Sequence, residues 1–126
     1  MIARLARSHA VHALGAFLAM GGWACFANSG HGLQAALTAG ALQGTLSACI
    51  TLTLKTMVER LAPRFHGAAA LWAPPALAAL VSAGLLTALH ALSGTPEILA
   101  TVALPLTVAT SYACLYNISL WKLRRR

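Results

Sequence analysis

The sequence predicts an all-α integral membrane protein of four transmembrane helices, arranged as two hairpins with both termini in the cytoplasm. Three observations support this prediction. Of the 126 residues, 59% are hydrophobic and 9% are charged, whereas a soluble domain carries about 25% charged residues. Four apolar stretches are each long enough for the roughly 20 residues that cross a bilayer. The nine lysines and arginines avoid two of the three links between these stretches.

The predicted spans cover residues 10–27, 33–54, 73–92 and 98–120, and they form a single transmembrane domain over residues 1–126. The links 28–32 and 93–97 carry no lysine or arginine. Because basic segments stay on the cytoplasmic side, the chain is expected in the inner membrane of a bacterial-type cell with both ends inside. The basic residues lie before the first span, between the second and third, and after the fourth: Arg4, Arg7, Lys55, Arg60, Arg64, Lys122, Arg124, Arg125 and Arg126.

The net charge of +7 indicates contact with anionic lipid rather than with nucleic acid. The basic residues flank apolar spans and do not form a soluble patch. In the link between the second and third spans, Lys55, Arg60 and Arg64 are candidates to contact a lipid head group or another anion. The expected partners are therefore the bilayer, a second copy of the chain or other membrane subunits.

The first two spans are rich in small residues, and Trp23 stands where an interfacial aromatic residue is expected. The link 28–32 is short, so these spans should form a tight antiparallel pair. Small residues let helices approach closely in lipid, so a regular ridge of them predicts a surface for self-association or for another subunit. In the second span they recur at every fourth position: Ala36, Gly40, Gly44 and Ala48.

A polar ridge runs beside the small one, with members at Gln43, Ser47, Thr51, Lys55 and Glu59. A helix has 3.6 residues per turn, so a four-residue repeat drifts by about 40° at each step. The first three members therefore share one face. Glu59 has rotated away from that face and is expected to pair with Lys55.

Prolines predict the boundaries of the later spans. The third span is expected to begin around Pro74 and Pro75, because proline is tolerated in a first helical turn. Pro63 ends any helix that continues from the second span. The fourth span opens on residues 95–97, where the Thr95 hydroxyl is expected to cap the helix.

Polar residues of the fourth span are candidates to meet the polar ridge of the second. Gln43 falls near mid-span, and Thr107 or Thr110 at similar depth would supply partners for its amide. Two interpretations stay open: a polar track through the membrane, or hydrogen bonds between helices that contribute about 0.6–2 kcal/mol each. The candidate residues are Gln43, Ser47, Thr51, Thr107, Thr110 and Asn117.

No catalytic site or metal site is expected. The predicted spans contain no Asp or Glu, so they lack an acid to orient a catalytic base and a carboxylate for ion coupling. A b-type haem is a less favoured cofactor, with His12 and His66, or His31 and His90, as axial ligands. His31 lies in a glycine turn and His66 precedes a helix, and both are poor platforms for a ligand.

The predicted function is that of a small polytopic membrane protein in transport or lipid translocation, acting as an oligomer or with partners. The alternative is a non-catalytic accessory or assembly subunit of a membrane complex, in which the ridges serve only for packing. The third choice is a membrane anchor subunit that binds haem b.

Overall fold

The computed structural model describes Met1 and residues 8–126. The predicted basic residues Arg4 and Arg7 lie outside the described residues. Four long α-helices build the described chain, and each is long and apolar enough to cross a membrane. The all-helical prediction with four candidate spans is confirmed. The elements are α2 (His9–Ala27), η1 (Ser29–His31), α3 (Leu33–Leu61), η2 (Ala62–Arg64), α4 (Ala69–Ser93) and α5 (Ile98–Arg124).

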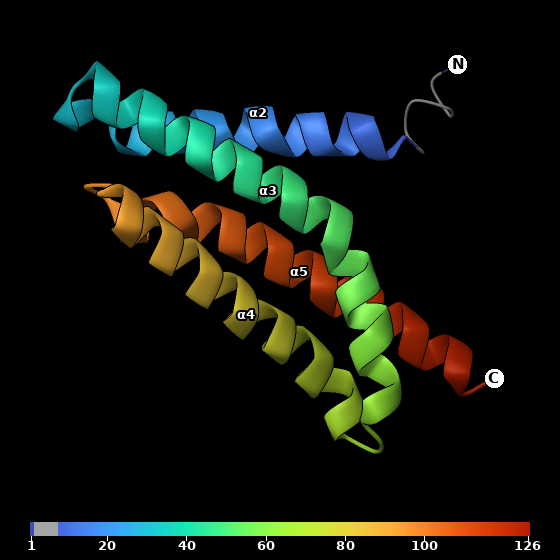
Figure 1. The fold of residues 1–126 in the computed structure, drawn as a ribbon. Helices are drawn as coiled ribbons and strands as arrows, with labels where there is room; N and C mark the ends of the chain where they lie inside the picture. Colours follow the sequence, from blue (N-terminus) through green and yellow to red (C-terminus); the bar gives the residue numbers. More distant parts are fainter. Residues whose placement is uncertain (2–7) are drawn as a thin grey trace.

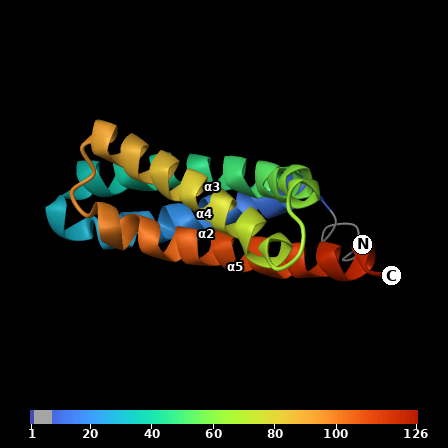
Figure 2. The same cartoon turned by 90° about the horizontal axis from the view of Figure 1, so that it is seen from below.

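Helix α2 packs along α3, and α4 packs along α5 (Figure 1). Helix α3 also contacts α4 and α5, so it joins the two pairs. The links 28–32 and 94–97 lie at one end of the bundle, which we call the turn end (Figure 2). The link 62–68 and the basic C-terminal residues 122–126 lie at the opposite end, which we call the basic end.

Many large apolar side chains cover the outside of the bundle, and small or polar ones make up most of its interior, together with Leu54, Val58 and Leu86. Leu18, Leu80 and Leu115 are each more than 60% exposed, whereas Ala24 and Ala113 are fully buried. In water this distribution would leave much apolar surface without a partner. In a bilayer, lipid tails solvate the leucines, while the small residues allow close helix contact.

The glycine ridge of α3 is used within the chain, where it packs against α2. A Cβ atom added at Gly44 would lie 2.9 Å from the carbonyl oxygen of Phe17, and one added at Gly21 would lie 2.9 Å from that of Gly40. These helices therefore touch through their backbones. Of the predicted packing surface, Ala36, Gly40 and Gly44 are buried and Ala48 is half-buried. Most of the ridge is therefore covered within the chain, and only Ala48 stays partly accessible.

Several helix ends differ from the predicted spans. Helix α3 continues to Leu61, seven residues past the predicted end, and stops at the turn that contains Pro63. Its 29 residues correspond to about 44 Å of helix, which is longer than a hydrocarbon core of roughly 30 Å. The final turns of α3, which carry Lys55, Glu59 and Arg60, therefore extend beyond the apolar stretch.

The predicted start of the third span at Pro74 and Pro75 is wrong. Helix α4 begins five residues earlier, at Ala69, and both prolines lie inside it. Sequence reasoning placed them in the first turn, where their missing amide hydrogens have no helical partner. Inside a helix, amide hydrogens at positions 74 and 75 would bond the carbonyls of Ala70 and Leu71. Proline has no amide hydrogen, and the Asn117 side chain of α5 bonds these two carbonyls instead.

Candidate functional site

The polar ridge of α3 divides into two parts. Gln43 and Ser47 are buried in the bundle, whereas Thr51 and Lys55 are exposed. Ser47, Thr51 and Lys55 line a cavity of about 530 Å³ between α2, α3 and α5. We call it the central cavity. Part of the predicted ridge therefore faces an open volume, and the rest is enclosed.

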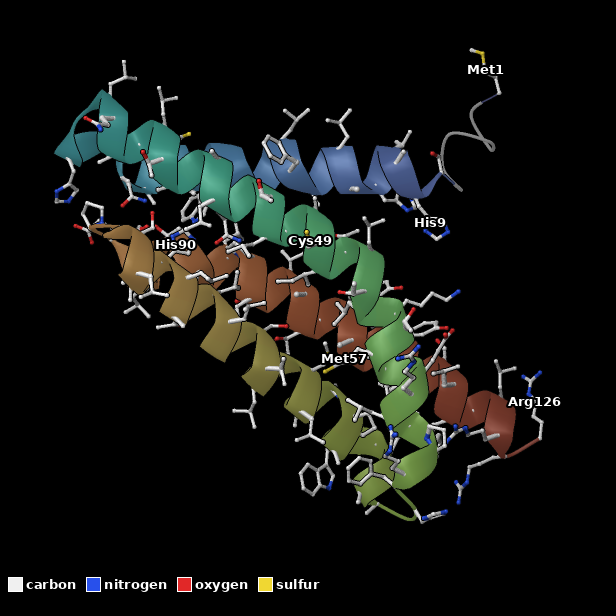
Figure 3. All side chains as sticks on the ribbon, in the orientation of Figure 1. Met1, His9, Cys49, Met57, His90 and Arg126 are labelled. Atoms are coloured by element: carbon white, nitrogen blue, oxygen red, sulfur yellow. The ribbon has the colours of Figure 1, made fainter. Side chains whose placement is uncertain are left out.

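The walls of the central cavity are mostly apolar, with polar groups toward the basic end. Helix α5 contributes Pro105, Val108, Ala109 and Tyr112. Figure 1 shows α2 and α5 diverging toward this end, and Figure 3 places His9 at the end of α2 opposite His90. The wall formed by α2 consists of His9, His12, Gly15, Ala16, Ala19 and Met20. The cavity therefore combines a mostly apolar wall with Lys55 and two histidines.

The buried part of the ridge forms a hydrogen-bonded chain across the two helix pairs. The Gln43 amide nitrogen donates to Ser47 Oγ at 2.8 Å, and Gln43 Oε1 lies 2.9 Å from His90 Nε2. An amide oxygen only accepts, so His90 Nε2 is the donor. In the neutral ring Nδ1 then accepts from the Thr95 hydroxyl at 2.7 Å. The chain links α3 to the end of α4.

This arrangement corrects two predictions. The partners of Gln43 are His90 and Ser47 rather than Thr107 or Thr110. Thr95 does not cap α5, because its hydroxyl is taken by His90 and the N-cap position belongs to Glu97. The prediction chose Thr107 and Thr110 because they lie at a similar depth in the membrane. It did not foresee that α4, which carries His90, lies beside α3 at the turn end.

Asn28 forms the second buried connection at the turn end. Its amide nitrogen donates to Thr101 Oγ1 at 2.7 Å and to the Ala24 carbonyl at 2.9 Å. Its oxygen accepts from the Glu97 backbone amide at 3.0 Å. Asn28 therefore satisfies an amide at the start of α5 from a different part of the chain, which is the role of an N-cap.

Two more contacts cross the turn end. His31 Nε2 lies 3.0 Å from Glu97 Oε1 on the exposed surface. The Trp23 indole nitrogen donates to the Ala100 carbonyl at 2.8 Å. These contacts join α2 and its following turn to the start of α5.

Asn117 performs a comparable task inside the α4–α5 pair. Its amide nitrogen donates to the carbonyls of Ala70 and Leu71, both at 2.9 Å. Those carbonyls lie four residues before Pro74 and Pro75, which have no amide hydrogen to offer them. Asn117 is 1% exposed, so it replaces in the interior both helical bonds that the prolines remove.

Thr107 and Thr110 lie apart from these connections. Both line a shallow groove on α5 with Ser111 and Cys114, and this groove shares no residue with the central cavity. The Thr107 hydroxyl donates to the Ala103 carbonyl of its own helix at 2.7 Å. The structure therefore does not bring the six candidate polar residues together as one track.

The three candidate anion-contact residues also separate. Lys55 lies 3.7 Å from Glu59, and this confirms the predicted pair. Glu59 also accepts a hydrogen bond from the Tyr116 hydroxyl of α5. Arg60 and Arg64 line a groove beside α3, where the Arg64 guanidinium donates to the Arg60 carbonyl at 2.5 Å. Of the three, only Lys55 reaches the central cavity.

The candidate haem ligands are not paired. Both ring nitrogens of His90 have protein partners, and His31 contacts Glu97. His12 lines the central cavity, whereas His66 lines a different cavity near the 62–68 link. Among the described residues, no three His, Cys, Asp or Glu side chains form a group that could hold a metal ion.

Sequence reasoning missed Asn28, Trp23 and Tyr116 as connecting residues. Each has a partner more than 50 residues away in the chain. For Asn28 a signal was present, because it directly follows a helix in a short link. An asparagine there can cap a helix that starts at the other short link, 94–97. Tyr116 gave no comparable signal.

The chain matches no protein-family model, no curated protein and no solved structure.

Proposed function

We propose that this protein is a small inner-membrane component of transport or lipid translocation, and that it binds amphipathic anions in the central cavity. The supporting observation is the cavity itself, about 530 Å³ between α2, α3 and α5. Its apolar interior suits an acyl chain or a similar apolar group. Lys55, His9 and His12 at its basic end suit an anionic head group.

The proposed orientation places the basic end in the cytoplasm, with both termini on that side. Among the described residues, Lys55, Arg60, Arg64 and the basic residues of 122–126 belong to the basic end, and no lysine or arginine lies in the links of the turn end. The positive-inside rule then favours this orientation. A reporter fused after Arg126 that is active only in the cytoplasm tests it, and activity of a periplasm-specific reporter at that site would refute it.

Filling the central cavity tests the binding proposal. Gly15 lines the cavity, and an added Cβ there meets no atom within 4 Å. Gly15→Leu therefore places a bulky side chain in the cavity without straining the helix. Gly22→Leu is the matched control, because Gly22 lies on the same helix, has equal free space and does not line the cavity.

The assay measures movement of a fluorescent anionic phospholipid between the leaflets of vesicles that contain the purified protein. Gly15→Leu should slow this movement by at least about tenfold, which corresponds to ~1.4 kcal/mol. Gly22→Leu should match the unmodified chain. Equal rates for all three proteins, or no movement above that in empty vesicles, would contradict the proposal.

An accessory or assembly subunit is the second candidate, and the enclosed half of the polar ridge favours it. Gln43 and His90 bond each other and are fully buried, as residues that serve only for packing would be. Gln43→Leu distinguishes the candidates. Loss of co-purifying membrane proteins or of self-association, with lipid movement unchanged, supports the accessory role. Loss of lipid movement with an intact assembly supports transport.

A further inference from the structure

A second cavity lies at the basic end, between the 62–68 link, the start of α4 and the end of α5. Its volume is about 630 Å³, and it shares no residue with the central cavity. We call it the loop cavity. Its polar lining residues are His66, Asn117, Arg124 and Arg125, and no aspartate or glutamate lines it. Its electrostatic character therefore favours an anion.

The start of α4 lies at this cavity, because Gly67, Ala68, Ala70 and Leu71 line it. The N-cap residue Ala68 offers no side-chain hydrogen bond, and the first turn holds no acidic residue. The amides of Ala70 and Leu71 reach back to the carbonyls of Gly67 and Ala68 at 3.3 and 3.1 Å. The earlier amides of the helix end have no helical acceptor, and the helix dipole makes this end partly positive. Such an end favours phosphate oxygens.

Asn117 supplies an independent indication of a ligand. It is 1% exposed, and its Oδ1 atom has no hydrogen-bond partner within the described chain. The amide cannot be turned round, because Oδ1 would then face the Ala70 and Leu71 carbonyls that its nitrogen now satisfies. A buried acceptor without a donor is costly. The wall of the loop cavity therefore contains an acceptor that needs a hydroxyl or another donor.

The arginines are arranged to hold an anion near this wall. The Arg125 guanidinium lies 4.4 Å from the centre of the Trp121 ring, and Trp121 also lines the cavity. Stacking on the ring restricts the guanidinium, so less conformational freedom is lost when it binds. The planar guanidinium can then form paired hydrogen bonds to a phosphate.

We propose that the loop cavity binds a phosphate ester that carries a free hydroxyl group. The phosphate oxygens contact Arg124 and Arg125 near the positive end of the α4 dipole, and the hydroxyl donates to Asn117 Oδ1. A glycerophospholipid with a glycerol head group has this chemistry, and so does soluble glycerol phosphate. The site goes beyond the proposed function, because it uses none of the residues that line the central cavity.

Native mass spectrometry of the full chain in detergent tests the arginines, with added phosphatidylglycerol as the probe and Gly15→Leu in every protein to fill the central cavity. The double variant Arg124→Gln/Arg125→Gln should weaken binding by about tenfold or more. Lys122→Gln/Arg126→Gln removes the same charge from residues outside the cavity and should change binding less than about twofold. Equal weakening by both double variants would mean that the lipid is held only by the overall positive charge of the C-terminal residues. That result would overturn the proposal.

The hydroxyl is tested through the ligand, because an Asn117 variant would also release the two carbonyls. Phosphatidylethanol has the same phosphodiester charge as phosphatidylglycerol but no head-group hydroxyl. It should bind the Gly15→Leu chain, in which the central cavity is filled, about fivefold more weakly, the value of one hydrogen bond. Equal binding of the two lipids, or of zwitterionic phosphatidylethanolamine, would contradict the proposal.

Competition identifies the natural source of the ligand. Displacement of phosphatidylglycerol by millimolar glycerol phosphate would support a soluble ligand for the same site. Retention of the lipid under these conditions would support a membrane lipid. Displacement that is equally strong in the Arg124→Gln/Arg125→Gln variant would place the competition elsewhere and overturn the assignment.

Discussion

The turn end of the bundle and the α2 wall of its basic end use polar side chains in opposite ways. At the turn end, Asn28, Gln43 and His90 are fully buried and hydrogen bond between the two helix pairs. At the basic end, His9 and His12 of α2 line the central cavity instead. Similar residue types thus either join helices or line open volume, and the separation of the helices decides which.

Small residues explain the difference in separation. Near the turn end, Gly21 of α2 meets Gly40 and Gly44 of α3 at backbone distance. Closer to the basic end, Gly15 and Ala16 also face inward, but they line the cavity. A small residue allows close packing only where the facing helix lies against it. Where the facing helix is farther away, the same small residue leaves free volume.

The largest expected loss of stability comes from Asn28→Leu at the turn end. The change removes one side chain that makes three hydrogen bonds, two of which reach Thr101 and Glu97. The free energy of unfolding should fall by about 3 kcal/mol, at roughly 1 kcal/mol for each bond. Unfolding in mixed detergent and dodecyl sulfate micelles measures it. Ser29→Ala, which loses only a local bond, is the control; an equal effect of both changes would disprove the assigned role.

A smaller loss is expected when the close contact between α2 and α3 is widened. Gly44→Ala places a methyl group 2.9 Å from the Phe17 carbonyl oxygen, and such overpacking costs about 2 kcal/mol. Gly84→Ala is the control, because its Cβ meets no atom within 4 Å. The control should gain up to about 1 kcal/mol from helix propensity. Thermal unfolding of both variants measures the effect. Equal changes in their unfolding temperatures would refute the backbone contact.

At the basic end, Asn117→Leu should cost about 1 kcal/mol. The Ala70 and Leu71 carbonyls lose their donor, but the substitution also removes the unpartnered Oδ1 atom. The two effects partly offset each other. Combining it with Pro74→Ala restores an amide for the Ala70 carbonyl, so the double variant should recover part of the loss in the same unfolding assay. No recovery would mean that the prolines are not the reason for this contact.

The smallest effect is expected for Tyr116→Phe. The hydroxyl contacts Glu59, a partly exposed residue that also pairs with Lys55. Exposed charge contacts contribute little, so the change should cost about 0.5 kcal/mol or less. A loss as large as that for Asn28→Leu would remove the distinction between the two ends.

The apolar spans were predictable because hydropathy over about 20 residues is a local property. The contacts that join them were less predictable. Asn28 and Thr101 are 73 residues apart, and Asn117 bonds carbonyls 46 and 47 residues away. The start of α4 was predicted wrongly from its prolines. The donor that compensates for them, Asn117, lies on another helix and leaves no signal near them in the sequence. Ser47, Thr51 and Lys55 of the α3 ridge line the central cavity, but the ridge pattern could not show that Gln43 is enclosed.

Distance measurements between spin labels test the contrast between the ends most directly. One label pair replaces Phe26 and Leu99 near the turn end, and the other replaces Val11 and Leu115 toward the basic end; all four side chains are exposed. The native Cys25, Cys49 and Cys114 are first changed to alanine. We expect a narrow distance distribution at the turn end. At the basic end we expect a broader one. It should narrow when phosphatidylglycerol is added to the Arg124→Gln/Arg125→Gln variant, in which the lipid can still occupy the central cavity. Equally narrow distributions at both ends, unchanged by lipid, would contradict the account.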